Sequence, residues 1–341
     1  MSLATKYRPQ RFEEVTEQSV TTSILRNQLE NNEIKNAYLF CGGAGTGKTT
    51  CARIFANEIN KHVGTPIELD AASNNSVDDV RNLIDQAQTA SIDSEYKVFI
   101  MDEVHALSNN AWQAMLKILE EPPKKSIFIM CTTNPEKIPK TILSRVQRYD
   151  FQRISHQGIV DRLLEILGKE FEYPSVDSTA IDYIAKLAEG GMRDAITMLE
   201  KCLLFNEDLT IENVMQALGC ESVPRMIKFA KYILGSDLDE IFNTISTIHA
   251  EGKDLKLFVR QFSDFLLDTG RAYISASLEH TRLPDTQEVN RWVDSINGET
   301  FNELMDLLDC SLSISRDIKW DSSPKSIIEA RYILFSRKEN K

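Results

Sequence analysis

Residues 42–49 read Gly42-Gly43-Ala44-Gly45-Thr46-Gly47-Lys48-Thr49, and this stretch decides the fold of the first half of the chain. It matches the pattern G-x-x-x-x-G-K-[ST], an apolar run at 37–41 precedes it, and apolar residues at helical spacing follow it to 59. Glycines let the backbone turn successive amides toward phosphate oxygens, and the start of a helix adds partial positive charge. The stretch therefore predicts a phosphate-binding loop, rather than a glycine-rich turn with a chance lysine.

The side chains of this loop suit a nucleoside triphosphate accompanied by magnesium. In loops of this kind the lysine, here Lys48, reaches the β- and γ-phosphates, and the hydroxyl of the following residue, Thr49, ligates Mg²⁺. We therefore expect ATP and Mg²⁺ to bind here, with contacts from Gly43, Ala44, Gly45, Thr46, Gly47, Lys48, Thr49 and Thr50.

A second acidic motif completes the expected site. Residues 98–101 are apolar and lead directly into Asp102 and Glu103. In open α/β sheets ligands bind at the carboxyl ends of the strands, so Asp102 is expected to hold the magnesium shell and Glu103 to polarise the attacking water. An apolar run ending in two acids is a weak signal alone, but it gains strength from the neighbouring motifs. His105, two residues further on, is interpreted as serving local structure.

Strands and helices alternate over the first half of the chain. Strands are predicted at 37–41, 66–69, 97–102, 127–132 and 148–151, with helices at 49–59, 77–88 and 110–120, a pattern typical of a parallel sheet covered on both faces. After 151 we expect only helices, at 160–171, 178–188, 193–205 and 211–218, followed by amphipathic stripes from 222 onward. The predicted domains are an α/β domain at 1–153, a small helical domain at 154–220 and a second helical domain at 221–341.

Composition limits the function classes. The net charge is −12, from 39 basic and 51 acidic residues, which argues against a general basic surface for DNA. The six cysteines form no CxxC pair, so neither zinc nor a disulfide framework is expected. No segment resembles a signal peptide or a membrane span, and we expect a cytoplasmic protein without a membrane partner.

Several motifs together resemble the clamp-loader branch of the AAA+ ATPases, and most closely the bacterial DNA polymerase III gamma/tau subunits. The resemblance rests on residues 102–108 followed by residues 116–123. Motifs similar to those of the family are closely spaced over about residues 1–220. Tyr7-Arg8-Pro9 is similar to the family's opening segment, and Thr132-Thr133-Asn134-Pro135 to its sensor 1. Residues 141–145 resemble the serine-arginine motif, and 190–195 resemble sensor 2. The resemblance implies an AAA+ nucleotide-binding domain, a helical lid and an all-helical C-terminal collar for oligomerisation.

The resemblance also implies roles for individual residues. Tyr7 and Arg8 would fold over the nucleotide base, and Thr133 would be the sensor 1 residue. Arg145 would reach the ATP of a neighbouring subunit, and Arg193 would contact the γ-phosphate of its own subunit. Considered singly, each arginine is more often a surface salt-bridge partner, and Thr133 equally suits a satisfied hydroxyl at a strand end.

Residues 73–76 and Arg81 are candidate DNA contacts by the same resemblance. In the family, the start of the corresponding helix faces primed DNA, and backbone amides with short polar side chains bind phosphates there. The alternative is that Ser76 simply caps the helix at 77–88. The candidate DNA contacts are Ser73, Asn74, Asn75, Ser76 and Arg81.

The sequence departs from the gamma/tau pattern at three places. Residues 60–66 contain no cysteine, where these subunits usually carry a four-cysteine zinc module. The serine-arginine motif continues with Val146 in place of the usual cysteine. The sequence given ends at Lys341, without the long tail of the tau form.

The resemblance implies an ATPase motor subunit that opens a sliding clamp on binding ATP, places it on primed DNA and releases it on hydrolysis. The partners implied are the clamp, primer-template DNA and other loader subunits in a hetero- or homo-oligomer, five by family resemblance. Two alternatives remain open. One is another DNA-associated AAA+ remodeller, such as a branch-migration motor. A winged-helix domain at the C-terminus would favour the motor. The other is a non-hydrolysing scaffold subunit of a clamp loader, against which the intact loop and Glu103 argue.

Overall fold

The computed structural model describes residues 1–89, 91, 93–170, 176–321 and 323–338. The chain forms two compact units, one of Met1–Glu170 with Ala188–Glu200 and one of Phe171–Leu187 with Lys201–Lys341. Residue 171, the predicted end of the helix at 160–171, lies outside the described residues. Among the described helices, none combines the length and the apolar character that crossing a bilayer requires.

A five-stranded sheet with the strand order β2-β3-β4-β1-β5 forms the centre of the first unit. Every pair of neighbouring strands is parallel, because helices connect consecutive strands. This confirms the parallel sheet that the alternation predicted. The strands are β1 (Ala37–Gly42), β2 (Ile67–Asp70), β3 (Lys97–Asp102), β4 (Ser126–Thr132) and β5 (Gln147–Phe151).

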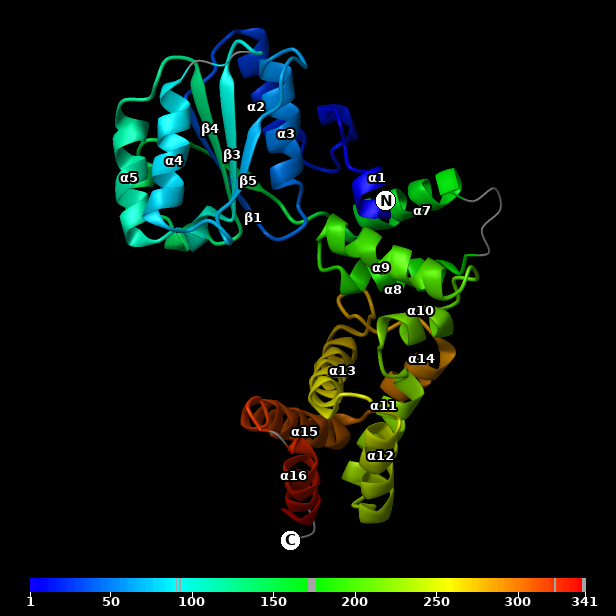
Figure 1. The fold of residues 1–341 in the computed structure, drawn as a ribbon. Coiled ribbons are helices and arrows are strands. Elements are labelled where there is room, and N and C mark those ends of the chain that lie inside the picture. The colour runs from blue at the N-terminus through cyan, green and yellow to red at the C-terminus, as the bar shows by residue number, and fades with distance from the viewer. Residues whose placement is uncertain (90, 92, 171–175, 322, 339–341) are drawn as a thin grey trace. The chain divides into compact units, whose positions relative to one another are not determined.

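Helices cover both faces of the sheet, with α4 and α5 on one face and α2 and α3 on the other (Figure 1). Side chains of a strand alternate between faces, so Phe99 and Met101 join the core beside α4 and α5, whereas Val98 and Ile100 join the core beside α2 and α3. The helices and turns of this unit are α1 (Leu3–Lys6), η1 (Phe12–Glu14), α2 (Ser19–Glu30), α3 (Lys48–Ile59), α4 (Val77–Gln88), η2 (Val104–Ala106), α5 (Asn109–Glu120), η3 (Pro135–Lys137), α6 (Lys140–Leu143), α7 (His156–Glu170) and the first part of α9 (Met192–Phe205).

The strand register brings three motifs to one edge of the sheet. Cys41 of β1 is level with Thr132 of β4, and Met101 of β3 is level with Met130 of β4. The carboxyl ends of β1, β3 and β4 therefore emerge side by side, which is where open α/β sheets bind their ligands.

The second unit is helical. The predicted absence of strands after residue 220 is confirmed for the part of the chain that the structure describes. Side-chain oxygens at several of the described helix starts accept backbone amides, which satisfies donors that helix ends leave open; these residues include Asp177, Thr210, Asp237, Asp254, Thr286 and Asn297. The helices are α8 (Ser178–Leu187), α10 (Ile211–Leu218), α11 (Val223–Leu234), α12 (Leu238–Ala250), α13 (Leu255–Ser275), α14 (Gln287–Asp294), α15 (Gly298–Asp317) and α16 (Pro324–Lys338).

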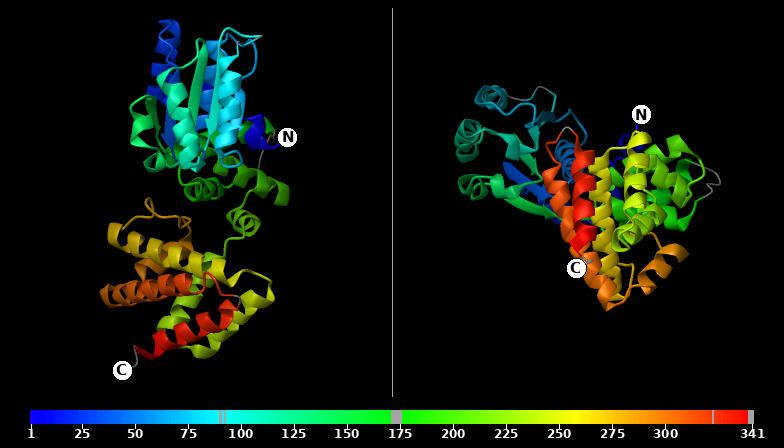
Figure 2. Two further views of the ribbon diagram at one scale, coloured as in Figure 1. Left: turned by 60° about the vertical axis from the view of Figure 1, so that its left-hand side comes forward. Right: turned by 90° about the horizontal axis from the view of Figure 1, so that it is seen from below.

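Aromatic side chains form the centre of this second unit. Helices α13 and α15 lie side by side, as Figures 1 and 2 both show. The ring of Phe229 meets the rings of Phe258, Phe262 and Tyr332 edge-on at 4.9–5.4 Å between centroids. Such edge contacts stabilise a core beyond the area that they bury. The apolar stripes predicted from 222 onward are therefore core, as the spacing indicated.

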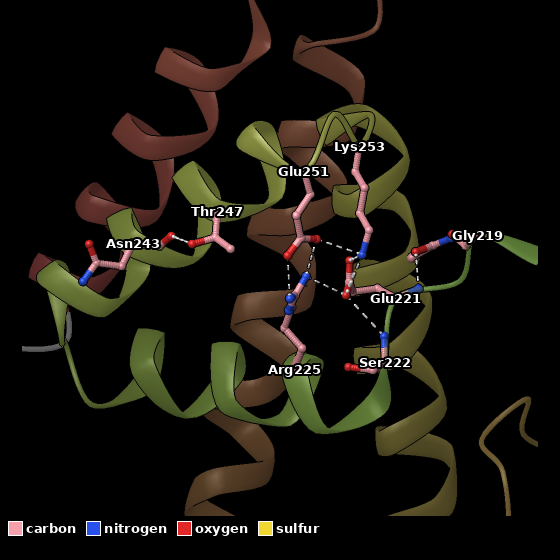
Figure 3. Close-up of polar contacts among 9 residues, drawn as sticks. Gly219, Glu221, Ser222, Arg225, Asn243, Thr247, Glu251 and Lys253 are labelled. Atoms are coloured by element: carbon pink, nitrogen blue, oxygen red, sulfur yellow. Dashed lines mark hydrogen bonds and ion pairs between the residues drawn. The ribbon is translucent and has the colours of Figure 1, made fainter. Parts of the chain in front are cut away.

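An ion-pair network fixes the segment between α10 and α11 (Figure 3). The Glu221 carboxylate, only 5% exposed, lies 3.0 Å from both Arg225 Nη1 and Lys253 Nζ. Arg225 also donates to both carboxylate oxygens of Glu251, at 2.9 and 3.0 Å. The Gln261 side chain donates to the carbonyl of Gly219 and accepts the amide of Glu221. These contacts attach the segment to α13 and to the turn after α12.

Candidate active site

The glycine-rich segment at 43–47, the candidate phosphate-binding loop, lies between β1 and α3, so the predicted strand and helix flank it. Gly45 and Gly47 have φ angles of +70° and +98°, a region that favours glycine. A Cβ atom at position 45 would also lie 3.0 Å from the Cα of Gly191, so no larger residue fits there without movement. The pattern fixes glycine at position 47, and the backbone angles favour glycine at both 45 and 47.

Lys48 is buried at the first position of α3. Its Nζ donates hydrogen bonds to the carbonyls of Gly42 at 2.9 Å and Gly43 at 2.6 Å. Burial lowers the pKa of this amine, and the nearby Cys131, Glu103 and Asp102 act in the opposite direction. A cation withdrawn from water in this way gains strongly from an anionic partner such as a phosphate.

The two expected magnesium ligands meet across the site. Thr49 Oγ1 donates to Asp102 Oδ2 at 2.7 Å, although 53 positions separate the residues. Hard oxygen donors of this kind suit Mg²⁺, which typically takes one or two protein oxygens together with substrate phosphates and water. The donor set therefore fits Mg²⁺. This pair is a different kind of site from a cluster of three or more His, Cys, Asp or Glu side chains. Among the described residues, no such cluster is placed to hold a metal ion.

Glu103 follows β3 directly and has a φ angle of +48°, which is uncommon for a residue with a side chain. Its Oε2 accepts a hydrogen bond from Thr133 Oγ1 at 2.9 Å, and the amide of Thr133 lies 3.3 Å away. The same oxygen is 3.1 Å from Nδ1 of His105. The structure thus brings the candidate general base and the candidate sensor residue into direct contact.

A cavity of about 310 Å³ opens beside the phosphate-binding loop. The N-terminal segment forms one wall and is held in place by α7 and α9: Tyr7 Oη donates to Glu170 at 2.6 Å, Arg162 donates to the carbonyl of Tyr7, and Leu3 N donates to Glu200. The lining includes most predicted nucleotide contacts, namely Tyr7, Arg8, Gly45, Thr46, Gly47, Lys48, Thr49, Thr50 and Arg193. Gly43 and Ala44 belong to the loop but do not line this cavity.

Arg193 reaches the cavity because α9 begins at the loop itself. The amide of Met192 donates to the carbonyl of Gly45 at 3.0 Å. The start of α9 is therefore attached to the phosphate-binding loop by the backbone, one residue before Arg193.

Arg145 lies away from this cavity, in the segment between β4 and β5. Its Nη2 donates to Glu120 Oε1 at 2.6 Å, and its Nη1 donates to the carbonyl of Thr141 and to Ser144 Oγ. These partners are all outside the loop and the cavity lining. The structure therefore does not bring Arg145 together with the other candidate catalytic residues of its own chain.

The candidate DNA contacts make local hydrogen bonds instead of forming an open basic surface. Ser76 and Asp79 form a reciprocal capping box at the start of α4, the structural role considered for Ser76. Ser73 Oγ donates to Asp70, and Arg81 pairs with Asp78 at 3.1 Å. Asn74 Nδ2 donates to the carbonyl of Asp70, and the carbonyl of Asn75 accepts the amide of Ser108.

Three further side chains support the site beyond the predicted contacts. Glu120 holds Arg145, and His105 contacts Glu103. Gln18 is buried and donates to the carbonyl of Gln152 at 2.8 Å, while its side-chain oxygen accepts the Gln152 amide. Of the three, His105 was expected to serve local structure, and Gln18 belongs to the opening segment that resembles the family's; no sequence signal indicated the contact of Glu120 with Arg145.

The chain is similar to known proteins over most of its length. A family profile described as "DNA polymerase III, delta subunit" matches residues 66–155. The DNA polymerase III subunit tau of Bacillus subtilis (strain 168) is 36% identical over 96% of this chain, which spans 62% of that relative's length. The DNA polymerase III subunit gamma of Buchnera aphidicola subsp. Schizaphis graminum is 32% identical over 76% of this chain and 78% of its own length.

Solved structures support the fold independently. The Thermotoga maritima RuvB Holliday junction branch migration motor superposes with a TM-score of 0.52 over 77% of this chain and 91% of its own, at 16% identity. At that identity the likeness concerns the fold alone, a parallel α/β unit with further helices. Together with the extent of the match to the gamma and tau sequences, these findings show that the chain belongs to the DNA polymerase III gamma/tau family.

Proposed function

We propose that this chain is the ATP-hydrolysing motor subunit of a DNA sliding-clamp loader. The observation that carries the proposal is the pair of contacts at the sheet edge, Thr49 with Asp102 and Thr133 with Glu103. They gather a phosphate-binding loop, a magnesium ligand pair and a general base, which is the set of groups that phosphoryl transfer to water requires.

Each side chain has a distinct task in the proposed reaction. Lys48 binds the β- and γ-phosphate oxygens, while Thr49 and Asp102 hold Mg²⁺, whose charge offsets that of the phosphates. Glu103 takes a proton from water as the water oxygen bonds to the γ-phosphorus; the bond from that phosphorus to the bridging oxygen breaks, and ADP leaves. The γ-phosphoryl oxygens carry charge in the transition state, so a positioned arginine lowers the barrier.

The two arginines divide this last task in the proposal. Arg193, the second residue of the helix attached to the loop, contacts the γ-phosphate of its own subunit, which couples the lid to the nucleotide. Arg145 pairs with Glu120, away from its own loop, and acts on the ATP of a neighbour. A lone subunit then has an incomplete site, and assembly through the helices at 221–341 completes it.

Coupling to a clamp is proposed from the family. The gamma and tau relatives are named as DNA polymerase III subunits, and this chain spans 62% of the length of the Bacillus subtilis relative. In the proposal, ATP binding assembles subunits that open the clamp at a primer-template junction, and hydrolysis releases the closed clamp on DNA. The candidate contacts at 73–76 and Arg81 would bind that DNA.

Two alternatives receive less support. A branch-migration motor with a C-terminal winged helix would need a strand pair after residue 220, and the described residues there form helices without strands. A non-hydrolysing scaffold subunit would not need Glu103 in contact with both Thr133 and His105.

The experiment is steady-state ATP hydrolysis by the purified chain, alone and with its loader partners, with and without primed DNA and a bacterial sliding clamp. We expect strong stimulation by DNA and clamp together, and loss of turnover in Glu103→Gln with ATP binding retained. Hydrolysis that is indifferent to the clamp would favour another remodeller, and an absence of turnover in every assembly would favour a scaffold subunit.

A further inference from the structure

The carboxylate of Glu103 is held asymmetrically. One oxygen, Oε2, meets Thr133 Oγ1 at 2.9 Å, the Thr133 amide at 3.3 Å and His105 Nδ1 at 3.1 Å. Within the described part of the chain, the other oxygen, Oε1, makes no hydrogen bond or ion pair, and the side chain is 35% exposed. One oxygen is therefore anchored while the other is open to water.

The imidazole of His105 is itself anchored to the centre of the sheet. Its Nδ1 lies 3.3 Å from Oγ1 of Thr132, the last residue of β4. Thr132 is fully buried, and its hydroxyl oxygen accepts the amide of Asn134 at 3.0 Å. His105 is the middle residue of the turn η2, whose first residue, Val104, is fully buried. The turn therefore fixes the backbone position of His105, two residues after Glu103. The position of the ring is thus set by the same strands that position the site.

The contact distance determines which nitrogen carries the proton. An ionised carboxylate only accepts hydrogen bonds, so a ring nitrogen that faces it at 3.1 Å must bear a hydrogen. We therefore assign the proton to Nδ1, which makes its hydrogen bond with Thr132 Oγ1 at 3.3 Å and lies 3.1 Å from Glu103 Oε2. In this tautomer Nε2 is the acceptor nitrogen and faces away from the carboxylate.

We propose that His105 is a positioning residue for Glu103, holding Oε2 with Thr133 so that Oε1 is presented to the attacking water. The inference rests on the proposed ATPase activity, in which Glu103 is the base. The proton of water passes to Oε1, the water oxygen bonds to the γ-phosphorus, and the bond to the bridging oxygen of ADP breaks. His105 neither gains nor loses a proton in this step; it restricts the orientation of the carboxylate.

The His105 contact limits rotation of the Glu103 carboxylate, which follows a strained backbone position and would otherwise depend on Thr133 alone. Misplacement of a reacting group by about 1 Å costs roughly 100-fold in rate, so orientation of the carboxylate is the contribution of His105.

The test compares three substitutions that differ in which ring nitrogen they imitate. The amide nitrogen of asparagine occupies the place of Nδ1, whereas that of glutamine occupies the place of Nε2. In the DNA- and clamp-stimulated assay we expect His105→Ala to lower kcat about tenfold, within the roughly 100-fold cost of misplacement, with KM for ATP unchanged. His105→Asn should restore most of the lost kcat, and His105→Gln should not.

A purely structural role predicts a different pattern. All three variants would then lose kcat in proportion to their lower thermal midpoints, and Asn and Gln would be equivalent. That result, or an unchanged kcat in His105→Ala, would overturn the inference. Glu103→Gln is measured in parallel: turnover retained in that variant would refute the role of Glu103 and this inference with it, whereas turnover lost there but unchanged in His105→Ala refutes only the role of His105.

Discussion

The amide of Met192 donates a 3.0 Å hydrogen bond to the carbonyl of Gly45, which joins the first residue of α9 to the phosphate-binding loop. The two backbones come this close because glycines meet there: a Cβ at position 45 would lie 3.0 Å from Cα and 3.1 Å from C of Gly191. The loop and the start of α9, which carries Arg193, therefore line the same cavity. In our proposal, the helical lid that contains α9 responds to the nucleotide in two ways. One is this backbone contact, and the other is Arg193.

Gly45→Ala should disrupt this contact. The φ angle of +70° costs a residue with a Cβ about 1–2 kcal/mol, and the approach to Gly191 adds to that cost. We expect a lower free energy of unfolding and ATP affinity reduced by about tenfold, measured by titration with a fluorescent ATP analogue. Gly168→Ala in α7 is the matched control, because its Cβ meets no atom within 4 Å; it should raise stability by about 0.5–1 kcal/mol. Unchanged ATP affinity in Gly45→Ala would contradict the account.

Arg145→Ala should abolish most hydrolysis in the assembled loader while ATP binding by the isolated chain stays unchanged. Arginines that act on a transferring phosphoryl group contribute about 10³-fold or more to kcat. The thermal midpoint should change little, because exposed ion pairs such as the one with Glu120 contribute about 0–1 kcal/mol. Arg148→Ala, which removes an exposed arginine paired with Asp150, is the matched control and should retain hydrolysis.

Mixing two inactive variants tests whether Arg145 acts on a neighbour. Lys48→Ala subunits cannot use their own loop but still carry Arg145. Assemblies that contain both Lys48→Ala and Arg145→Ala subunits should regain part of the hydrolysis rate. If the mixtures stay as inactive as each variant alone, Arg145 does not act between subunits.

The ion-pair network at 221–253 should make stability depend on acid pH. The hydrogen bond from Arg225 is the main cause that lowers the pKa of Glu251 to about 2, from about 4.3 in an unfolded chain. Because the folded-state pKa is the lower one, the stabilisation is fully present above about pH 4.3 and is lost as the pH falls toward 2. The difference in urea midpoint between wild type and Glu251→Gln should be constant from pH 8 to 5 and shrink below that. A difference that grows on acidification would contradict this assignment.

The sequence predicted the elements that carry the site because each has a local signature. The strand ending in Asp102 is an apolar run, and the phosphate-binding loop has a fixed glycine spacing, so both were assigned close to their observed bounds. Contacts between side chains that are far apart in the sequence have no such local signature. Glu120 meets Arg145 across 25 positions, and Gln18 meets Gln152 across 134, contacts that depend on how packed elements meet. Even the contact of His105 with Glu103, only two residues apart, depends on the unusual backbone angle of Glu103.

The most direct test of the account follows a fluorescent sliding clamp on primed DNA with a loader reconstituted around this chain and its partner subunits. Wild type should deposit closed clamps that remain on the DNA after the loader dissociates. Glu103→Gln, which binds ATP without hydrolysing it, should deliver the clamp to the primed site but stay bound to it. Release of closed clamps by Glu103→Gln at the wild-type rate would contradict the claim that hydrolysis at this site frees the clamp.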